Sequence, residues 1–292
     1  MKENEEEEPK TNAARAVLAV LPGLMSGDHK TGSTGKIKTC ISWNVNGLSM
    51  RYAENQLMPV FQHNPEIICI QETKTPEEKI PEKLRNLYGY QMFCPPVAPG
   101  NFAETLLFTR TPPVSIRYGF GVPVLDAEGR VIIADFESFV IMNIYFPLGI
   151  PPVDTLEHKL AFYDAFLAEA GKLNDEGRRV IVCGDFSIAH TDNDIESVKK
   201  HAVRQVGTTP AEREKIDSLI RKGFYDTFRI FCKEKGHYTW WPNGFRLRDR
   251  HLGRRLDYFF VNEPMKPLIA GAGILPGFEG SDHCPVMLEV NQ

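Results

Sequence analysis

The chain has 292 residues, of which 42% are hydrophobic and 25% charged, with a formal net charge of −4. This balance predicts one large globular α/β domain, with two small domains as the alternative. No apolar run approaches the roughly 20 residues of a membrane-spanning helix, and the acidic residues before the apolar stretch 13–24 argue against a signal peptide. The net charge also argues against a uniformly basic coat for nucleic acid. We therefore expect an intracellular protein with no membrane partner, cytoplasmic in a prokaryote or nuclear in a eukaryote.

The first 36 residues combine an acidic run with Pro, Asn, Gly, Ser and Thr, and this composition predicts a flexible tail. Residues 37–292 are expected to form a single folded domain. Its cysteines are scattered, mostly inside apolar segments, and no two stand at the spacing of metal ligands. We expect buried free thiols in a reducing compartment.

From residue 38 the pattern alternates between strands and helices. Strands are expected at residues 39–43, 67–71, 91–94, 105–109, 130–135, 139–145, 180–183, 257–261, 270–275 and 286–290. Helices are expected on the approach to His63, at 156–174 and at 210–222. This succession, in which strands are followed by helices twice over, predicts two packed sheets covered by helices.

Acidic and amide side chains follow several of these strands. Asn44 and Asn46 end the first, Glu72 the second, and Asp185 follows the buried run 180–183. Near the end of the chain, Arg255-Leu256-Asp257-Tyr258 and Gly280-Ser281-Asp282-His283-Cys284-Pro285 add two carboxylates and an imidazole. An Asp and the His can form a hydrogen-bonded pair that polarises the imidazole, while the other Asp faces a metal or water. These are the residue types that a metal-assisted phosphodiesterase needs in its active site.

Taken together, the motifs resemble the exonuclease III family of apurinic/apyrimidinic (AP) endonucleases, within the endonuclease/exonuclease/phosphatase superfamily. The resemblance is continuous from about residue 38 to 290. It implies a four-layer α/β sandwich, with two mixed sheets between helices, and one catalytic domain with its site at one end of the sheets. The landmarks are Ser42-Trp43-Asn44-Val45-Asn46-Gly47, Gln71-Glu72-Thr73-Lys74, Glu128-Gly129-Arg130, Tyr145-Phe146-Pro147, Gly184-Asp185-Phe186, Tyr238-Thr239-Trp240-Trp241 and the two C-terminal motifs.

The resemblance implies a metal site at Glu72, because the metal-binding Glu of the family stands at this position. Asn46 and Asp282 complete the surroundings of the ion, partly through water. Hard oxygen ligands suit Mg²⁺, with Mn²⁺ as an alternative. Without the resemblance, Glu72 could instead be an acid at a helix N-terminus or an ordinary loop charge.

The same resemblance assigns Asp185 to generating or orienting the attacking water. It places His283, paired with Asp257, against the scissile phosphate. Asn44 positions Asp185 or the phosphate, and Tyr145 lies against the phosphate or the leaving group. By itself, Tyr145 could be an aromatic residue that closes a strand.

A basic stretch favours contact with DNA. Between residues 197 and 257, fifteen Lys and Arg stand against seven Asp and Glu. Aromatic side chains interleave with arginines there, in a pattern that suits a flipped-out sugar or a splayed backbone. We expect either Trp240 or Trp241 to line the pocket for an abasic deoxyribose and the arginines to hold phosphates, although Trp240 could instead belong to the core. The expected DNA-binding residues are Trp240, Trp241, Phe245, Arg246, Arg248 and Arg254.

Several positions depart from the family pattern. Ser187 stands where the family has Asn, and its hydroxyl offers one donor in place of two. Leu148 replaces an Asn or Gln, Glu104 lies in a segment that differs from the family's, and Arg254 replaces a Trp. The metal ligands and the Asp–His pair are retained, whereas several groups that position the substrate are not.

Two functions therefore remain open. The first is a monomeric, metal-dependent phosphodiesterase of base-excision repair that incises double-stranded DNA 5′ to abasic sites and acts on 3′ ends, with Ser187 as an altered catalytic group. The second is a weakened or inactive homologue that binds damaged or single-stranded DNA. Retention of Glu72, Asp185, Asp257, Asp282 and His283 favours the first.

Overall fold

The computed structural model describes residues 37–85, 87–98, 103–196, 207–242 and 245–291, without the side chains of Ile37, Tyr88, Phe245 and Arg246. The expected tail, residues 1–36, lies outside the described residues and stays a prediction. Within the described part, no helix is long and apolar enough to cross a membrane. All six cysteines are free and five of them are buried, as expected.

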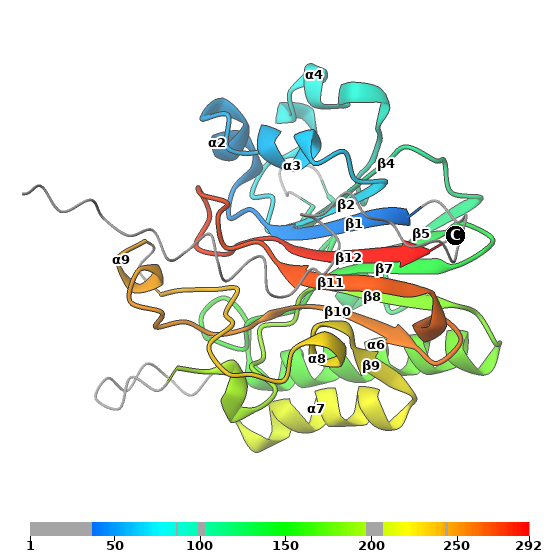
Figure 1. The fold of residues 1–292 in the computed structure, drawn as a ribbon. Helices are drawn as coiled ribbons and strands as arrows, with labels where there is room; N and C mark the ends of the chain where they lie inside the picture. Colours follow the sequence, from blue (N-terminus) through cyan, green and yellow to red (C-terminus); the bar gives the residue numbers. More distant parts are fainter. Residues whose placement is uncertain (1–36, 86, 99–102, 197–206, 243–244, 292) are drawn as a thin grey trace, which may run out of the picture.

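Two six-stranded sheets form the centre of the molecule (Figure 1). Each is antiparallel except for one parallel pair, β1 with β2 in the first sheet and β7 with β8 in the second. The first sheet has the order β11 (Ile269–Ile274), β12 (Val286–Asn291), β1 (Ile37–Asn44), β2 (Ile67–Gln71), β4 (Thr105–Thr109) and β3 (Gln91–Phe93). The second has the order β5 (Ser115–Tyr118), β6 (Val131–Asp135), β7 (Val140–Tyr145), β8 (Val180–Asp185), β10 (Asp257–Asn262) and β9 (Phe224–Asp226).

Helices cover the outer face of each sheet, so that Figure 1 shows four layers from top to bottom. The first sheet carries α2 (Leu48–Ala53), α3 (Met58–Gln62) and α4 (Glu82–Arg85), and the second carries α6 (Leu156–Asp175) and α7 (Pro210–Arg221). The expected four-layer α/β sandwich is confirmed. Short elements complete the chain: α5 (Pro123–Asp126), α8 (Thr227–Phe231), α9 (Phe245–Arg248), η1 (Glu77–Lys79), η2 (Leu87–Gly89), η3 (Asp192–Asp194) and η4 (Lys266–Leu268).

Apolar side chains fill the space between the two sheets. Cys69 and Leu107 of the first sheet pack in one cluster with Ile141 and Ile181 of the second, and all four are buried. Removing such side chains from water stabilises the fold by about 1.5–3 kcal/mol each. The sheets are therefore fixed face to face, and their strand ends are fixed relative to one another.

One polar side chain crosses this apolar layer. The Asn143 amide donates to the carbonyls of Ile70 (3.3 Å) and Leu106 (2.9 Å), while its oxygen accepts from Gln71 Nε2 at 2.7 Å. A buried amide that finds partners on the opposite sheet fixes their relative register. It does so near the carboxyl ends of β2 and β7.

Strand directions bring the polar residues to one edge. β1 and β2 are parallel, as are β7 and β8, so their carboxyl ends meet at the same edge of each sheet. β10 runs antiparallel to β8 with Asp257 opposite Asp185 and therefore starts at this edge. The polar strand ends that the sequence spreads over more than 200 residues are thus gathered in one place.

All ten expected strands and the two long helices are observed, with boundaries that agree or differ by at most two residues. The helix expected on the approach to His63 is instead two short helices, α2 and α3, separated near Asn55, whose φ of 59° is incompatible with a continuing right-handed helix. Strands β5 and β9 were not expected. β5 is a half-exposed edge strand and β9 has three residues, so neither gives an apolar run in the sequence.

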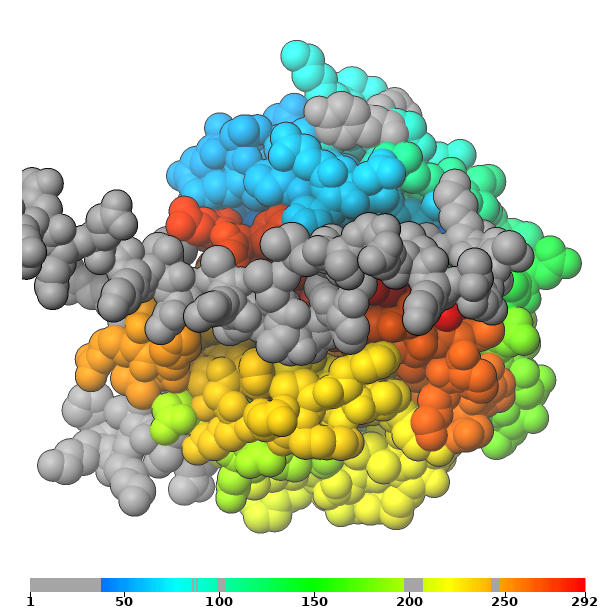
Figure 2. Space-filling model, viewed as in Figure 1, coloured from blue at the N-terminus to red at the C-terminus, as the bar shows by residue number. Residues whose placement is uncertain are grey.

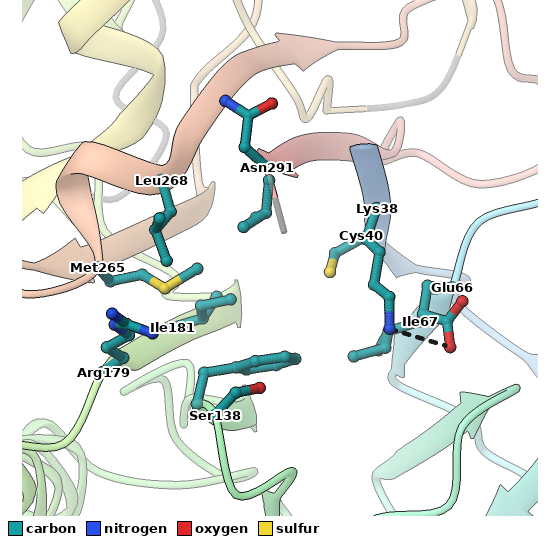
Figure 3. Close-up of a pocket in the computed structure, with 12 residues that line it drawn as sticks. Lys38, Cys40, Glu66, Ile67, Ser138, Arg179, Ile181, Met265, Leu268 and Asn291 are labelled. Atoms are coloured by element: carbon teal, nitrogen blue, oxygen red, sulfur yellow. Dashed lines mark ion pairs between the residues drawn. The ribbon is translucent and has the colours of Figure 1, made fainter. Parts of the chain in front are cut away.

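A cavity of about 370 Å³ lies between the sheets at the opposite edge (Figure 3). It is lined near the start of β1 by Lys38 and Cys40, near the start of β8 by Ile181, and near the end of β12 by Asn291. Its lining is mostly apolar, and the acids and the histidine expected at the active site are absent from it. The cavity is therefore separate from the site described below.

Candidate active site

The centre of the site is a buried pair formed by His283 and Asp257. His283 Nδ1 lies 2.8 Å from Asp257 Oδ2, and His283 Nε2 lies 3.7 Å from Asp185 Oδ2. None of the three residues is more than 4% exposed. The imidazole therefore sits between two carboxylates, one in hydrogen-bond contact and one slightly farther away.

This arrangement sets the charge of His283. Burial lowers the pKa of His283, but the carboxylates of Asp257 and Asp185 outweigh this effect and raise it to about 10. His283 is thus an imidazolium at neutral pH, with a proton on each ring nitrogen. It can donate from Nε2 to an anion while Nδ1 remains engaged with Asp257.

Asp185 is held by its neighbours at the end of β8. Its Oδ2 accepts from Asn44 Nδ2 at 2.9 Å, and its Oδ1 accepts from the Ser187 backbone N–H at 2.7 Å and, more weakly, from the Ser187 hydroxyl at 3.3 Å. Burial raises the pKa of Asp185 to about 7, against the opposing effect of His283. A carboxyl group with this pKa can exchange a proton with water near neutral pH.

A second set of oxygen atoms lies beside this pair. Asn46 Nδ2 donates to Asp282 Oδ1 at 2.8 Å, and Trp240 Nε1 donates to Asp282 Oδ2 at 2.9 Å. Burial acts to raise the pKa of Asp282, but His283 and these two hydrogen bonds lower it below its ordinary value. Asp282 is therefore ionised at neutral pH.

Glu72 joins this set through Lys74, whose role is not apparent from the sequence. The Lys74 ammonium lies 2.7 Å from Glu72 Oε1 and 2.6 Å from Asn46 Oδ1. A cation thus already bridges two of the three expected metal-binding side chains. Lys74 is about half exposed, so its side chain can move aside.

Backbone conformation supports a specialised site. Asn46, Glu72, Lys74 and Ser187 all have positive φ, between 46° and 56°. Left-handed backbone is uncommon for residues other than glycine and tends to cluster at functional sites. Four such residues gather here although they come from three separate strand ends.

Asp185, Asp257 and His283 can each offer one ligand atom, all within 4.8 Å of one another. A carboxylate/histidine cluster of the kind that binds metals is therefore present. Within it, Asp257 Oδ1 is buried and has no hydrogen-bond partner in the described part of the chain. Protonated His283 cannot itself be a ligand, which leaves the oxygen set of Asn46, Glu72 and Asp282 as the better cation site.

Tyr145 lies at the end of β7, opposite Asp185 in register. The Arg130 guanidinium stacks over the Tyr145 ring at 4.9 Å, and burial raises the Tyr145 pKa well above its ordinary value. The phenol is therefore neutral. In the sequence Arg130 is only part of the Glu128-Gly129-Arg130 motif, and its place beside Tyr145 is visible only in the fold.

The two tryptophans occupy different environments, which corrects one expectation. Trp241 is 4% exposed and packs with Tyr238 and Cys284, while the Arg248 guanidinium covers its ring at 4.6 Å. Trp241 is thus a core residue and cannot line an open pocket. Trp240 is partly exposed and lies beside His283, with the ring centroids 6.4 Å apart.

The basic stretch is also less available to DNA than its composition indicated. Arg255 is buried, with Asp194 at 2.7 Å and Asp226 at 2.6 Å, and Arg248 donates to the Pro276 carbonyl. Arg254 lies beside Trp240, with its guanidinium carbon 5.8 Å from the ring centroid. The Phe245 and Arg246 side chains lie outside the described residues. Further ion pairs engage Arg213, Lys215, Arg221, Arg229 and Lys235.

The loop that carries Asp282 and His283 reaches the helices on the first sheet. Arg51 of α2 donates to the Gly280 carbonyl and to Gln56. In the space-filling view, the red-orange segment that leads into β12 lies against the blue α2–α3 region (Figure 2). The site loop is therefore supported by the first sheet's outer layer.

The sequence profile of the Endonuclease/Exonuclease/phosphatase family matches residues 41–283, a span that includes the site residues from Asn44 to His283. The chain belongs to this family. Its members depend on divalent metal, and this chain has both a carboxylate/histidine cluster and, beside it, the oxygen set of Asn46, Glu72 and Asp282.

Among curated relatives, the exodeoxyribonuclease of Bacillus subtilis is 34% identical over 86% of this chain and 98% of its own length. A DNA-(apurinic or apyrimidinic site) endonuclease of Dictyostelium discoideum is 33% identical over 86% of this chain and 70% of its own length. Recombination repair protein 1 of Drosophila melanogaster is 34% identical over 87% of this chain, which spans only 37% of that relative. The expected enzyme class, a nuclease-type hydrolase of the exonuclease III and AP endonuclease group, is confirmed.

Solved structures agree on the fold. The 3′ phosphatase NExo from Neisseria, in a structure bound to a product DNA hairpin, has a TM-score of 0.76 and 23% sequence identity, covering 87% of this chain and all of that one.

Proposed function

We propose that this protein is a Mg²⁺-dependent phosphodiesterase that incises double-stranded DNA 5′ to abasic sites and also acts on blocked 3′ ends. One observation carries the proposal: the His283 imidazole and the buried Asp185 carboxyl group face each other, with His283 Nε2 3.7 Å from Asp185 Oδ2, beside a separate set of hard oxygen ligands. This combination of a proton donor, a proton acceptor and a cation site is what in-line hydrolysis of a phosphodiester requires.

The residues fit a hard divalent cation. Glu72, Asp282 and Asn46 offer carboxylate and amide oxygens, the donors that Mg²⁺ prefers, and the Lys74 ammonium between Glu72 and Asn46 indicates that this position attracts positive charge. Mn²⁺ takes the same ligands. When bound, the ion supplies charge neutralisation at the phosphoryl oxygens.

The remaining roles belong to the chain itself. Asp185, oriented by Asn44 and by the Ser187 backbone, accepts a proton from the attacking water. His283 donates from Nε2 to a phosphoryl oxygen, and Asp257 keeps its ring oriented. The neutral phenol of Tyr145 is a hydrogen-bond donor toward the phosphate or the leaving oxygen.

Trp240 supports a DNA substrate. Its ring is partly exposed, adjoins His283 and is fixed by its hydrogen bond to Asp282. An aromatic ring beside the reacting phosphate can stack against an extruded sugar or an unstacked base. The names of the relatives, exodeoxyribonuclease and apurinic or apyrimidinic site endonuclease, support the same substrate class.

The test is incision of a duplex containing one abasic site, with Mg²⁺, with Mn²⁺ and with chelator, by the wild type and by Glu72→Gln. We expect incision 5′ to the site that depends on the ion, and a loss of at least about 10²-fold in rate for Glu72→Gln at low Mg²⁺. Glu77→Gln is the matched control, because Glu77 lies five residues further along the chain, is half exposed and pairs at the surface with Arg85.

Wild-type protein that retains abasic DNA but does not incise it above the level of Glu72→Gln contradicts the proposal. It would favour the DNA-binding homologue, whose affinity should fall steeply with salt.

A further inference from the structure

A buried ion pair lies directly behind the catalytic edge of the second sheet. Lys159 of α6 and Glu212 of α7 are 0% and 1% exposed, and their charged groups are 2.7 Å apart. Buried ion pairs are costly to desolvate and do not by themselves stabilise a fold. Fold stability therefore does not explain why the Lys159–Glu212 pair is buried, and another role is expected for it.

The Lys159 ammonium has three acceptors. It donates to Glu212 Oε1 at 2.7 Å, to the Ser187 carbonyl at 2.8 Å and to the Leu148 carbonyl at 3.3 Å. An ammonium has three N–H donors, and this geometry uses all of them. Two of the three acceptors are backbone atoms of the loops that follow β8 and β7.

Both backbone polar groups of Ser187 are therefore hydrogen-bonded. Its N–H donates to Asp185 Oδ1, and its carbonyl accepts from Lys159. Its φ of 51° is an unfavourable backbone conformation for serine, so the surrounding contacts must maintain it. The backbone at Gly207 also packs closely against the Ser187 carbonyl oxygen. A Cβ at Gly207 would lie only 2.5 Å from that oxygen, so no larger residue fits there without a shift.

Glu212 keeps Lys159 in place. Its carboxylate also accepts from the backbone N–H groups of Gly207 and Thr209 and from the Thr209 hydroxyl, and it belongs to the capping box at the start of α7. A glutamate is almost never fully buried unless it is paired. Here it is buried, and its negative charge faces the ammonium.

The loop after β7 closes over the other side of Lys159. Asp154 accepts from the backbone N–H groups of Leu148, Gly149 and Ile150. Gly149 has a φ of 77°, and a Cβ there would lie 3.0 Å from Lys159 Cδ. Leu148 and Ser187 are both positions where the side chain departs from the family pattern, yet each has its backbone carbonyl bound to the same ammonium.

We propose that Lys159 is a positioning residue, which fixes the Ser187 backbone and through it the orientation of the Asp185 carboxylate. The inference rests on the proposed function in so far as Asp185 is the catalytic carboxylate. It explains how Asp185 stays oriented although Ser187 lacks the family amide: the backbone N–H, held in place by Lys159, makes the shorter contact.

The test separates positioning from stability. Lys159→Met alone leaves Glu212 as an unpaired buried charge, so it is combined with Glu212→Gln, which keeps an oxygen for the N–H groups of Gly207 and Thr209 and leaves no buried charge. Lys215→Met is the matched control, since Lys215 pairs with Asp164 between the same two helices but at the surface. Incision of abasic-site DNA, the melting temperature and amide hydrogen exchange at Ser187 are measured for each variant.

We expect the double variant to recover a melting temperature within a few degrees of wild type while kcat stays at least tenfold lower, with KM changed less than twofold. Exchange at the Ser187 amide should be at least tenfold faster than in wild type and in Lys215→Met. A double variant with wild-type kcat overturns the proposal, because Lys159 is then only structural.

Hydrogen exchange also keeps the two proposals distinguishable. If wild-type protein does not incise DNA, the proposed function fails, and exchange at Ser187 still decides whether Lys159 fixes this backbone. Unchanged exchange in the double variant refutes the positioning role, whatever the activity.

Discussion

His283 Nδ1 lies 2.8 Å from Asp257 Oδ2, although Asp257 begins β10 in one sheet and His283 precedes β12 in the other. The Trp43 indole of β1 adds a hydrogen bond to the His283 carbonyl at 3.2 Å. The imidazole is thus fixed by both sheets, and its orientation depends on how they pack.

Asp257→Asn tests this relationship. An amide cannot supply the negative charge that holds His283 as an imidazolium, so we expect kcat for incision to fall by about 10²–10⁴-fold with little change in DNA affinity. Single-turnover incision and DNA binding measure the two effects. Glu263→Gln, just beyond the other end of β10 at an exposed surface pair, should change neither. An equal loss of kcat and of affinity would mean that the pair binds substrate and does not act mainly in the transition state.

Ser187→Asn restores the family amide. Asn tolerates left-handed backbone better than most residues, so the φ of 51° at this position does not oppose the change. We expect the rate of incision to rise, by up to about 10²-fold, while DNA affinity stays the same, because an amide offers the transition state a further donor. A lower rate in steady-state incision assays would show that the loop has adapted to serine.

The two neighbouring tryptophans should respond differently to truncation. Trp240→Ala should reduce the preference for abasic over intact DNA by about tenfold, since the aromatic ring that packs against the extruded sugar is removed. Trp241→Ala should instead lower the free energy of unfolding by about 3–5 kcal/mol, because it empties a buried volume. Competition binding and urea unfolding distinguish the two. Loss of discrimination in a stably folded Trp241→Ala protein would contradict the assignment of Trp241 to the core.

Asp194 should make stability depend on acidity. Burial acts to raise the pKa of Asp194, but Arg255 and Arg229 outweigh it and lower the pKa well below its usual range. Its contribution to stability is therefore complete above the unfolded pKa of about 4 and is lost as the pH falls toward the folded pKa. Urea unfolding at a series of pH values from about 7 to about 3 should show this loss in the wild type and a weaker dependence in Asp194→Asn.

At neutral pH, Asp194→Asn should lower the free energy of unfolding by about 3–5 kcal/mol, because it breaks a buried pair with Arg255. Asp192→Asn, two residues away in an exposed pair with Arg213, should cost less than about 1 kcal/mol. Equal effects of the two changes would show that burial does not strengthen the Asp194 contacts.

The sequence by itself determined the fold class and the order of most elements. Runs such as 180–185 and 257–262 are largely apolar because both faces of a central strand are covered, and α6 and α7 show the apolar spacing of helices packed on a sheet. The acids and the histidine were also recognisable, since they stand in short motifs at strand ends. Local pattern is sufficient for these features because each depends on residues close together in the chain.

Only the tertiary structure decided which side chains meet. Trp240 and Trp241 are adjacent in sequence and equally aromatic, yet opposite faces of one extended segment place one at the site and the other in the core. Arg255 resembles its basic neighbours in composition, but packing encloses it between Asp194 and Asp226. Nothing in the sequence of α6 around Lys159 indicates its positioning role. Its role depends on two backbone carbonyls and a carboxylate from three other segments, and only the packing of α6 against α7 and the second sheet brings these atoms together.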